Sequence, residues 1–288
     1  MTATGVKKHS YKLTQQEEWY VDWEDFSDQL KHHTRYVFYR VEKADAGDDT
    51  YERARIPHEI LDTIGELVLA QELIRTVSSG TEIVRARLHK ENERYSTVKE
   101  LGPPHNDKTV STRMSPAGIP MFYGSQREDT ALSEIGGNEF ATVAKFKALK
   151  DIKVLDLTKI PRVPSLFDQQ NNSERSALIF LWNFLEDLTK PIEKDDRVHI
   201  EYVPTQVVTE YFRRVFRDSE DAELKGVVYP SARHEGGISY VFFVDNDECT
   251  QDDEGDAAGE PLFSMITSSV KQVDLRNRST PPPVGELF

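Results

Sequence analysis

The sequence predicts an α+β protein, with a mixed β-sheet core preceded by a small helical N-terminal region. Two patterns predict this class. Apolar residues recur at helical spacing in some segments and at every second position in others, and the expected strands do not alternate regularly with helices as in βαβ folds. Of the 288 residues, 38% are hydrophobic and 30% are charged, a composition typical of globular proteins, so we expect the chain to fold.

Residues 1–80 are predicted to form the helical N-terminal region. Trp19, Trp23, Phe26 and Leu30 recur at helical intervals, and this stripe is interpreted as core packing rather than a cofactor site. A loop is expected over residues 44–52. It precedes a second helix, whose apolar positions are Ile60, Ile64, Leu67, Leu73 and Ile74.

Residues 81–288 are predicted to form the second domain. From residue 81 the pattern has period two, with apolar side chains at 84, 86 and 88 and Arg85, Arg87 and His89 between them, which predicts a strand with a polar face. Further strands are expected at residues 119–123, 142–146, 152–157, 226–229 and 238–244, and a helix at 129–135. Two more helices carry the apolar sets Leu178, Leu181, Trp182, Leu185, Leu188 and Val207, Val208, Tyr211, Phe212, Val215. Residues 245–260 are predicted to be an acidic loop, and residues 279–288 an extended tail.

The charge balance limits the function. Acidic residues outnumber basic ones by 50 to 36, for a net charge of −14, and such a field repels nucleic acid. Cys249 is the single cysteine, so neither an intramolecular disulfide nor a thiolate-rich metal site is expected. The histidines show no metal-ligand spacing, and we expect no metal and no cofactor. Without an apolar run long enough for a bilayer or a signal core, the expected location is cytoplasmic and away from membranes.

Four short segments, in this order, resemble the RES-domain family. They are IVRAR (83–87), RMSPAGIPMFY (113–123), TALSE (130–134) and GVVYPSAR (226–233). Residues 23–39 and 202–206 also resemble a longer subgroup, in which a helical region of HEPN/RES type precedes the catalytic domain. The resemblance implies a fold similar to the ADP-ribosyltransferases and an enzyme that consumes NAD⁺ as its substrate.

The chemistry of that reaction can be set beside the residues. Breaking the nicotinamide–ribose bond develops an oxocarbenium-like sugar, which a carboxylate near the ribose stabilises, and Glu134 is the candidate. Arg85 and Arg113 suit the pyrophosphate, because the guanidinium pairs bidentately with phosphate oxygens. Tyr123 offers an aromatic face for nicotinamide, and Ser231 a hydroxyl for the ribose or the acceptor. Arg87 and Arg233 are further candidates for phosphate contacts.

Several readings stay open at this point. The enzyme could be an NAD⁺ glycohydrolase, an NAD⁺ phosphorylase or an ADP-ribosyltransferase acting on a protein, and a non-catalytic NAD sensor would need the arginines but not Glu134. Arg53 and His58 have the spacing of the loose motif of HEPN-type RNases, although Pro57 favours a helix start at that point. The resemblance also implies a toxin or defence effector, an antitoxin or regulatory protein as partner, and a homodimer.

Overall fold

The computed structural model describes residues 23–24, 26–37, 57–137, 139–165, 172–189, 198–252 and 260–276. Trp19, Arg53, the predicted loop at residues 44–52 and the predicted tail at residues 279–288 lie outside these residues. Within the described part of the chain, no helix is both long enough and apolar enough to cross a membrane.

The core of the described structure is one mixed sheet of nine strands in the order β1-β5-β6-β7-β3-β2-β4-β9-β8. The pairs β5/β6 and β8/β9 are parallel and the others antiparallel. This arrangement confirms the α+β class. The strands are β1 (Ile74–Val77), β2 (Glu82–His89), β3 (Phe122–Ser125), β4 (Phe140–Ala148), β5 (Ile152–Asp156), β6 (Gly226–Pro230), β7 (Ile238–Phe242), β8 (Cys249–Gln251) and β9 (Phe263–Asp274).

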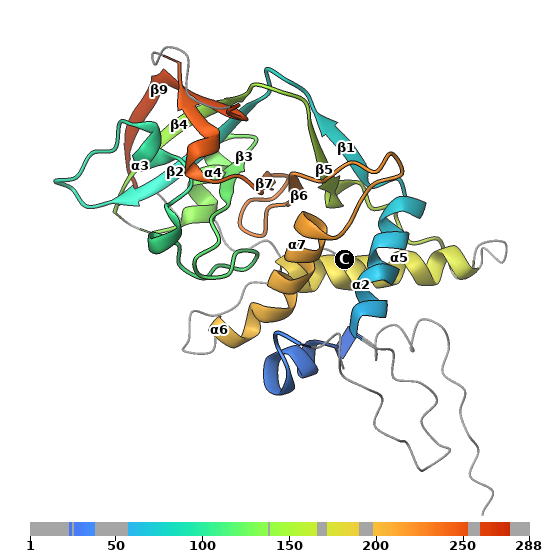
Figure 1. Ribbon diagram of the computed structural model, residues 1–288. Coiled ribbons are helices and arrows are strands. Elements are labelled where there is room, and N and C mark those ends of the chain that lie inside the picture. The colour runs from blue at the N-terminus through green and yellow to red at the C-terminus, as the bar shows by residue number, and fades with distance from the viewer. Residues whose placement is uncertain are drawn as a thin grey trace, which may run out of the picture.

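The longer helices gather on one side of this sheet, where α2, α5 and α7 lie together, while α4 lies close to β2 and β3 (Figure 1). The α-helices are α2 (Pro57–Ala70), α3 (Val98–Leu101), α4 (Glu128–Ile135), α5 (Asn172–Thr189), α6 (Val198–Glu201) and α7 (Val203–Arg214). The short turns are the π-helical η1 (Gln29–His33) and the 3-10 turns η3 (Asn106–Lys108), η4 (Leu157–Lys159) and η5 (Asn246–Glu248).

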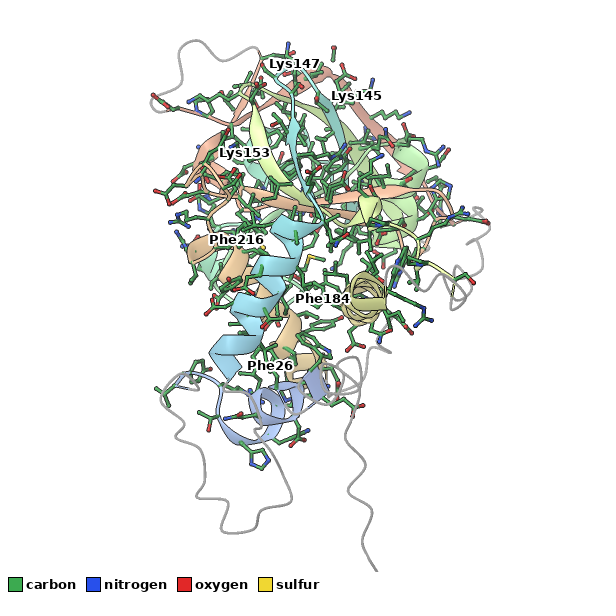
Figure 2. The ribbon with its side chains drawn as sticks, turned by 90° about the vertical axis from the view of Figure 1, so that its right-hand side faces the viewer. Phe26, Lys145, Lys147, Lys153, Phe184 and Phe216 are labelled. Carbon is green, nitrogen blue, oxygen red and sulfur yellow. The ribbon has the colours of Figure 1, made fainter. Side chains whose placement is uncertain are left out.

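The aromatic stripe near the N-terminus packs into the core, as the sequence predicts. Trp23, Phe26 and Leu30 are buried in the same cluster as Phe184 of α5 and Phe216 after α7. Figure 2 shows these phenylalanines on the helical side of the molecule, and Lys145 and Lys147 at its opposite end. The N-terminal segment therefore shares one apolar core with α5 and with the chain at the end of α7.

Several element predictions need correction. Leu73 and Ile74 do not continue the second helix, because α2 ends at Ala70 and Ile74 begins β1, which pairs with β5. The third strand begins at Phe122 rather than residue 119. Val215 is 64% exposed: it follows Arg214, the last residue of α7, while the next residue, Phe216, is the one that enters the core.

The acidic segment after β7 also contains more structure than predicted. Instead of a loop throughout, it forms the turn η5 and the short strand β8. Strand β9, which has 12 residues, is also not among the strands predicted from the sequence. Its exposed half carries serine, threonine, lysine and glutamine side chains, so its hydrophobic period is weak.

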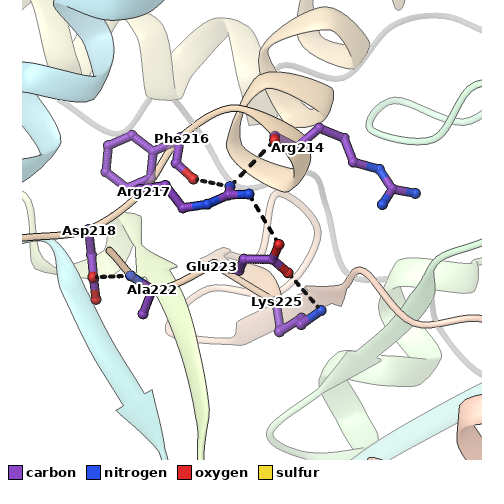
Figure 3. A network of polar contacts seen from close by, with 7 residues as sticks. All are labelled: Arg214, Phe216, Arg217, Asp218, Ala222, Glu223 and Lys225. Carbon is purple, nitrogen blue, oxygen red and sulfur yellow. Dashed lines mark hydrogen bonds and ion pairs between the residues drawn. The ribbon is translucent and has the colours of Figure 1, made fainter. Parts of the chain in front are cut away.

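A polar network fixes the connection between α7 and β6 (Figure 3). The Arg217 guanidinium donates to the carbonyl of Phe216 at 2.8 Å and to Glu223 at 3.1 Å, and Lys225 donates to the other oxygen of Glu223 at 3.1 Å. Such surface ion pairs add little to the free energy of unfolding. They hold the two sides of the connection between α7 and β6 together.

Candidate active site

A pocket of about 370 Å³ lies where the sheet opens between β2 and β3. The two strands pair at a single position, Val84 with Ser125, and both line the pocket beyond it. Its walls come from β2, β3, α4, β6, β7 and the segments around residues 112 and 202. The lining residues are Arg85, Ala86, Thr112, Arg113, Met114, Tyr123, Gly124, Ser125, Ala131, Glu134, Ile135, Tyr202, Tyr229, Ala232, Arg233 and Ser239.

Two serine hydroxyls hold the carboxylate of Glu134 in this pocket. Oε1 accepts hydrogen bonds from Oγ of Ser231 at 2.6 Å and Oγ of Ser239 at 3.1 Å. Oε2 accepts no hydrogen bond from any residue that the structure describes. Hydrogen bonds to a charged acceptor are stronger than neutral ones. The pair therefore fixes one carboxylate oxygen and leaves the other available to a ligand.

Ser231 contacts Glu134 but does not face the pocket itself. It is buried and does not line the pocket. Besides donating to Glu134, its Oγ accepts from the backbone N–H groups of Arg233 at 3.2 Å and His234 at 3.0 Å. One hydroxyl offers one donor and two acceptor positions, so all of its capacity is used.

The loop between β6 and β7 is joined to α4 one turn before Glu134 as well. Thr130, four residues before Glu134 and fully buried, bonds Nδ1 of His234 through its hydroxyl at 2.8 Å. Residues i and i+4 share a face of a helix, so the loop is fixed to α4 at two points on one face. Gly136 then lets Arg233 approach: its φ is +58°, and a Cβ there would lie 2.6 Å from Nη1 of Arg233.

Arg113 enters the pocket from the segment before β3. Its Nη1 donates to the carbonyl of Leu188, in the last turn of α5, at 3.2 Å. A cation is favourable at a helix C-terminus, where carbonyl groups lack helical partners. Its other N–H groups have no acceptor among the described residues, and the same is true of the exposed Arg233 side chain. Both guanidinium groups can therefore donate to an anion.

Arg85 is used differently, since it bonds the protein itself. The alternation along β2 and β3 places it on the opposite face from Tyr123, where it lies 5.1 Å from the ring centroid of Phe122. Its guanidinium donates to the carbonyls of Leu101 and Tyr123, both at 2.6 Å, and of Gly102 at 3.2 Å. Burial lowers its pKa to about 10, so it stays protonated at neutral pH. Arg85 thereby joins β3 to the C-terminal end of α3, at the point where β2 and β3 separate.

Two tyrosines, the half-buried Tyr123 and the buried Tyr229, line the pocket. The hydroxyl of Tyr123 bonds Oγ1 of Thr112 at 2.6 Å, and burial raises its pKa to about 12. Tyr229 faces Ser239 across the β6/β7 pair, and burial, with the nearby Glu134 carboxylate, raises its pKa further. Neither tyrosine is a base or nucleophile at neutral pH, so they supply aromatic surface and hydrogen bonds.

Comparison with known proteins decides the family. The RES domain family matches residues 83–262, well over half of the chain. The chain belongs to the RES domain family. No curated protein and no solved structure matches it. Membership of the family supports a broad NAD-related role of toxin type.

In this RES-domain protein, the structure brings together most of the residues that the sequence pointed to. Arg85, Arg113, Tyr123, Glu134 and Arg233 line one pocket, and Ser231 lies directly behind Glu134. Arg87 lies outside the lining: its guanidinium bonds the carbonyl of Glu100 and lies 5.1 Å from the ring centroid of Tyr95. Sequence reasoning missed Ser239, Tyr229, Thr112 and Tyr202, although Tyr229 and Tyr202 stand within motifs that it quoted.

Other chemistries find little support around this pocket. Among the described residues, no group of three or more histidine, cysteine, aspartate or glutamate side chains could hold a metal ion. Burial raises the pKa of the Cys249 thiol to about 12, so it is not a thiolate nucleophile at neutral pH. Of the proposed RNase pair, His58 is the second residue of α2 and Arg53 lies outside the described residues.

The three carbonyl contacts of Arg85 predict that Arg85→Lys lowers stability. A lysine ammonium is compact and cannot span acceptors from two segments, so at least one buried carbonyl loses its donor. We expect a loss of about 2 kcal/mol, which lowers Tm by roughly 4–8 °C, measured by calorimetry. The exposed Arg94→Lys is the control and should leave Tm unchanged. An unchanged Tm for Arg85→Lys would contradict the structural role.

Proposed function

We propose that this protein cleaves the nicotinamide–ribose bond of NAD⁺, with water or phosphate as the acceptor. The observation that carries the proposal is the Glu134 carboxylate, fixed by Ser231 and Ser239 in a pocket that also presents the guanidinium groups of Arg113 and Arg233. A carboxylate and cations in one pocket suit a substrate with an electron-poor sugar and a pyrophosphate. RES family membership supports NAD⁺ as that substrate.

The reaction requires charge stabilisation more than acid catalysis. The C1′–N bond breaks with both electrons going to nicotinamide, which leaves as a neutral molecule, and positive charge develops on the ribose. The Glu134 carboxylate stabilises that charge. Water then adds its oxygen to C1′ and loses one proton, giving ADP-ribose. Alternatively, a phosphate oxygen adds and gives the 1-phosphate ester of ADP-ribose.

The arginines counter the acidity of the protein. With a net charge of −14, the protein repels an anionic substrate at long range. Arg113 and Arg233 place two guanidinium groups on different walls of the pocket, and their free N–H groups match phosphate oxygens. We assign them to the pyrophosphate. Arg85, which bonds three carbonyls, instead positions the segment that carries Tyr123.

The test is incubation of the purified protein with NAD⁺, with and without phosphate, followed by chromatography of nicotinamide and the ADP-ribose product. Arg113→Ala and Arg233→Ala should each lower kcat/KM roughly 10- to 100-fold, because each loses a charged hydrogen bond to phosphate. Exposed Arg94→Ala is the matched control. The product formed with phosphate present distinguishes phosphorolysis from hydrolysis.

Release of nicotinamide at the same rate by wild type and both arginine variants would contradict the assignment of this pocket. Release that occurs only when an acceptor protein is added, with ADP-ribose found on that protein, would identify an ADP-ribosyltransferase instead. Binding of NAD⁺ without release under every condition would identify a sensor.

A further inference from the structure

The segment that carries Arg113 is held by the first turn of α7. We infer that Gln206 is a positioning residue, which fixes Arg113 and Tyr123 for the reaction. This inference goes beyond the proposed function, because it concerns residues that do not line the pocket. Its turnover test rests on that function, and a second readout does not.

Gln206 donates from its side-chain amide to several oxygens of one short segment. Nε2 lies 2.7 Å from the carbonyl of Thr112, 2.9 Å from Oγ of Ser111 and 3.3 Å from the carbonyl of Ser115. These acceptors bracket Arg113 on both sides. The Gln206 side chain is buried, so no bulk water can replace its two N–H groups if they are removed.

The neighbouring residue of α7 holds Arg113 itself. Oγ1 of Thr205 donates to the backbone carbonyl of Arg113 at 2.6 Å and also lies 2.9 Å from the carbonyl of Tyr202. Tyr202 lines the pocket immediately before α7. One helical turn therefore fixes the backbone on which the Arg113 guanidinium depends.

The same amide is also linked to Tyr123, through Thr112. Thr112, whose carbonyl accepts from Gln206, bonds the Tyr123 hydroxyl through Oγ1 at 2.6 Å, and that Oγ1 accepts from the N–H of Ser115 at 3.2 Å. A change at Gln206 therefore reaches a proposed phosphate ligand and an aromatic residue together. Displacement of a catalytic constellation by about 1 Å can cost on the order of 100-fold in rate.

The experiment compares Gln206→Met with wild type. Methionine is similar in length and apolar, but it cannot donate. We expect kcat/KM for NAD⁺ cleavage to fall roughly 10- to 100-fold, while the exposed Gln272→Met changes nothing. Thr205→Val, which removes one hydroxyl, should act in the same direction with a smaller effect. This second variant keeps the test valid if Gln206→Met does not fold.

A double-mutant cycle separates positioning from general destabilisation. If Gln206 acts through Arg113, then Gln206→Met lowers kcat/KM much less in an Arg113→Ala background than in wild type. A full, additive loss in that background would overturn the inference. If the wild type does not cleave NAD⁺, the proposed function fails. The inference about Gln206 is then tested separately, by the backbone mobility of residues 111–115. Backbone ¹⁵N relaxation should show residues 111–115 rigid in wild type and mobile in Gln206→Met, and equal rigidity in both would overturn it.

Discussion

Glu134→Gln is expected to lose at least about 100-fold in kcat for NAD⁺ cleavage, with KM nearly unchanged. The amide has the shape of the carboxylate and can still accept a hydrogen bond from Ser231 or Ser239, so the pocket keeps its form. It lacks the negative charge that opposes the positive charge of the ribose, and that charge develops only in the transition state. Initial rates of nicotinamide release, with NAD⁺ binding measured by calorimetry, provide the test.

The matched control is Glu128→Gln on the same helix, whose carboxylate pairs with Lys271 at the surface rather than entering the pocket. That variant should keep full activity. If the enzyme uses Glu134, then Glu134→Gln should bind NAD⁺ normally and lose turnover. Equal turnover in Glu134→Gln and wild type would remove the central role of this carboxylate. Normal binding with no turnover in either protein would identify a sensor.

The period-two pattern around residue 85 was sufficient to predict β2, but not to assign its arginines. Alternation places Arg85 and Arg87 on one face, but it does not say what each guanidinium bonds. Arg85 lines the pocket and bonds the carbonyl of Tyr123, whereas Arg87 lies outside the lining and bonds the carbonyl of Glu100. The short motif therefore indicates the right region, whereas one partner of Arg85 lies on a strand 38 residues away in sequence.

Ser239 shows why part of the site could not be predicted. A serine within an apolar strand carries no signal of its own. Ser239 belongs to the site because it pairs with Tyr229 on β6 and with Ser125 on β3. These pairings bring its hydroxyl to Glu134. The same is true of Gln206, whose three acceptors lie more than 90 residues earlier in the chain. Local patterns predict elements, whereas such contacts follow from sheet order and helix packing.

A chain that begins at Ser79 is expected not to fold. It would lack β1 and the buried apolar residues that pack against α5 and α7: Trp23, Phe26, Leu30, Ile60, Leu61, Ile64, Leu67, Val68 and Leu73. Burial of each such side chain is worth about 1.5–3 kcal/mol. Together the burial of these side chains is worth as much as, or more than, the roughly 5–15 kcal/mol by which whole domains are stable. Circular dichroism should show no cooperative unfolding transition, and size-exclusion chromatography should show aggregates.

A milder change, Trp23→Phe, tests the contact between the N-terminal segment and α5. Nε1 of Trp23 donates to Asp187 at 2.6 Å, and the next residue, Leu188, supplies the carbonyl that holds Arg113. Trp23→Phe keeps most of the apolar contact and removes this bond, so it should lower Tm slightly and leave a folded protein with measurable activity. If the chain from Ser79 instead folds with unchanged activity and mass, then residues 1–78 are a separate unit, and the domain boundary predicted near residue 80 is correct.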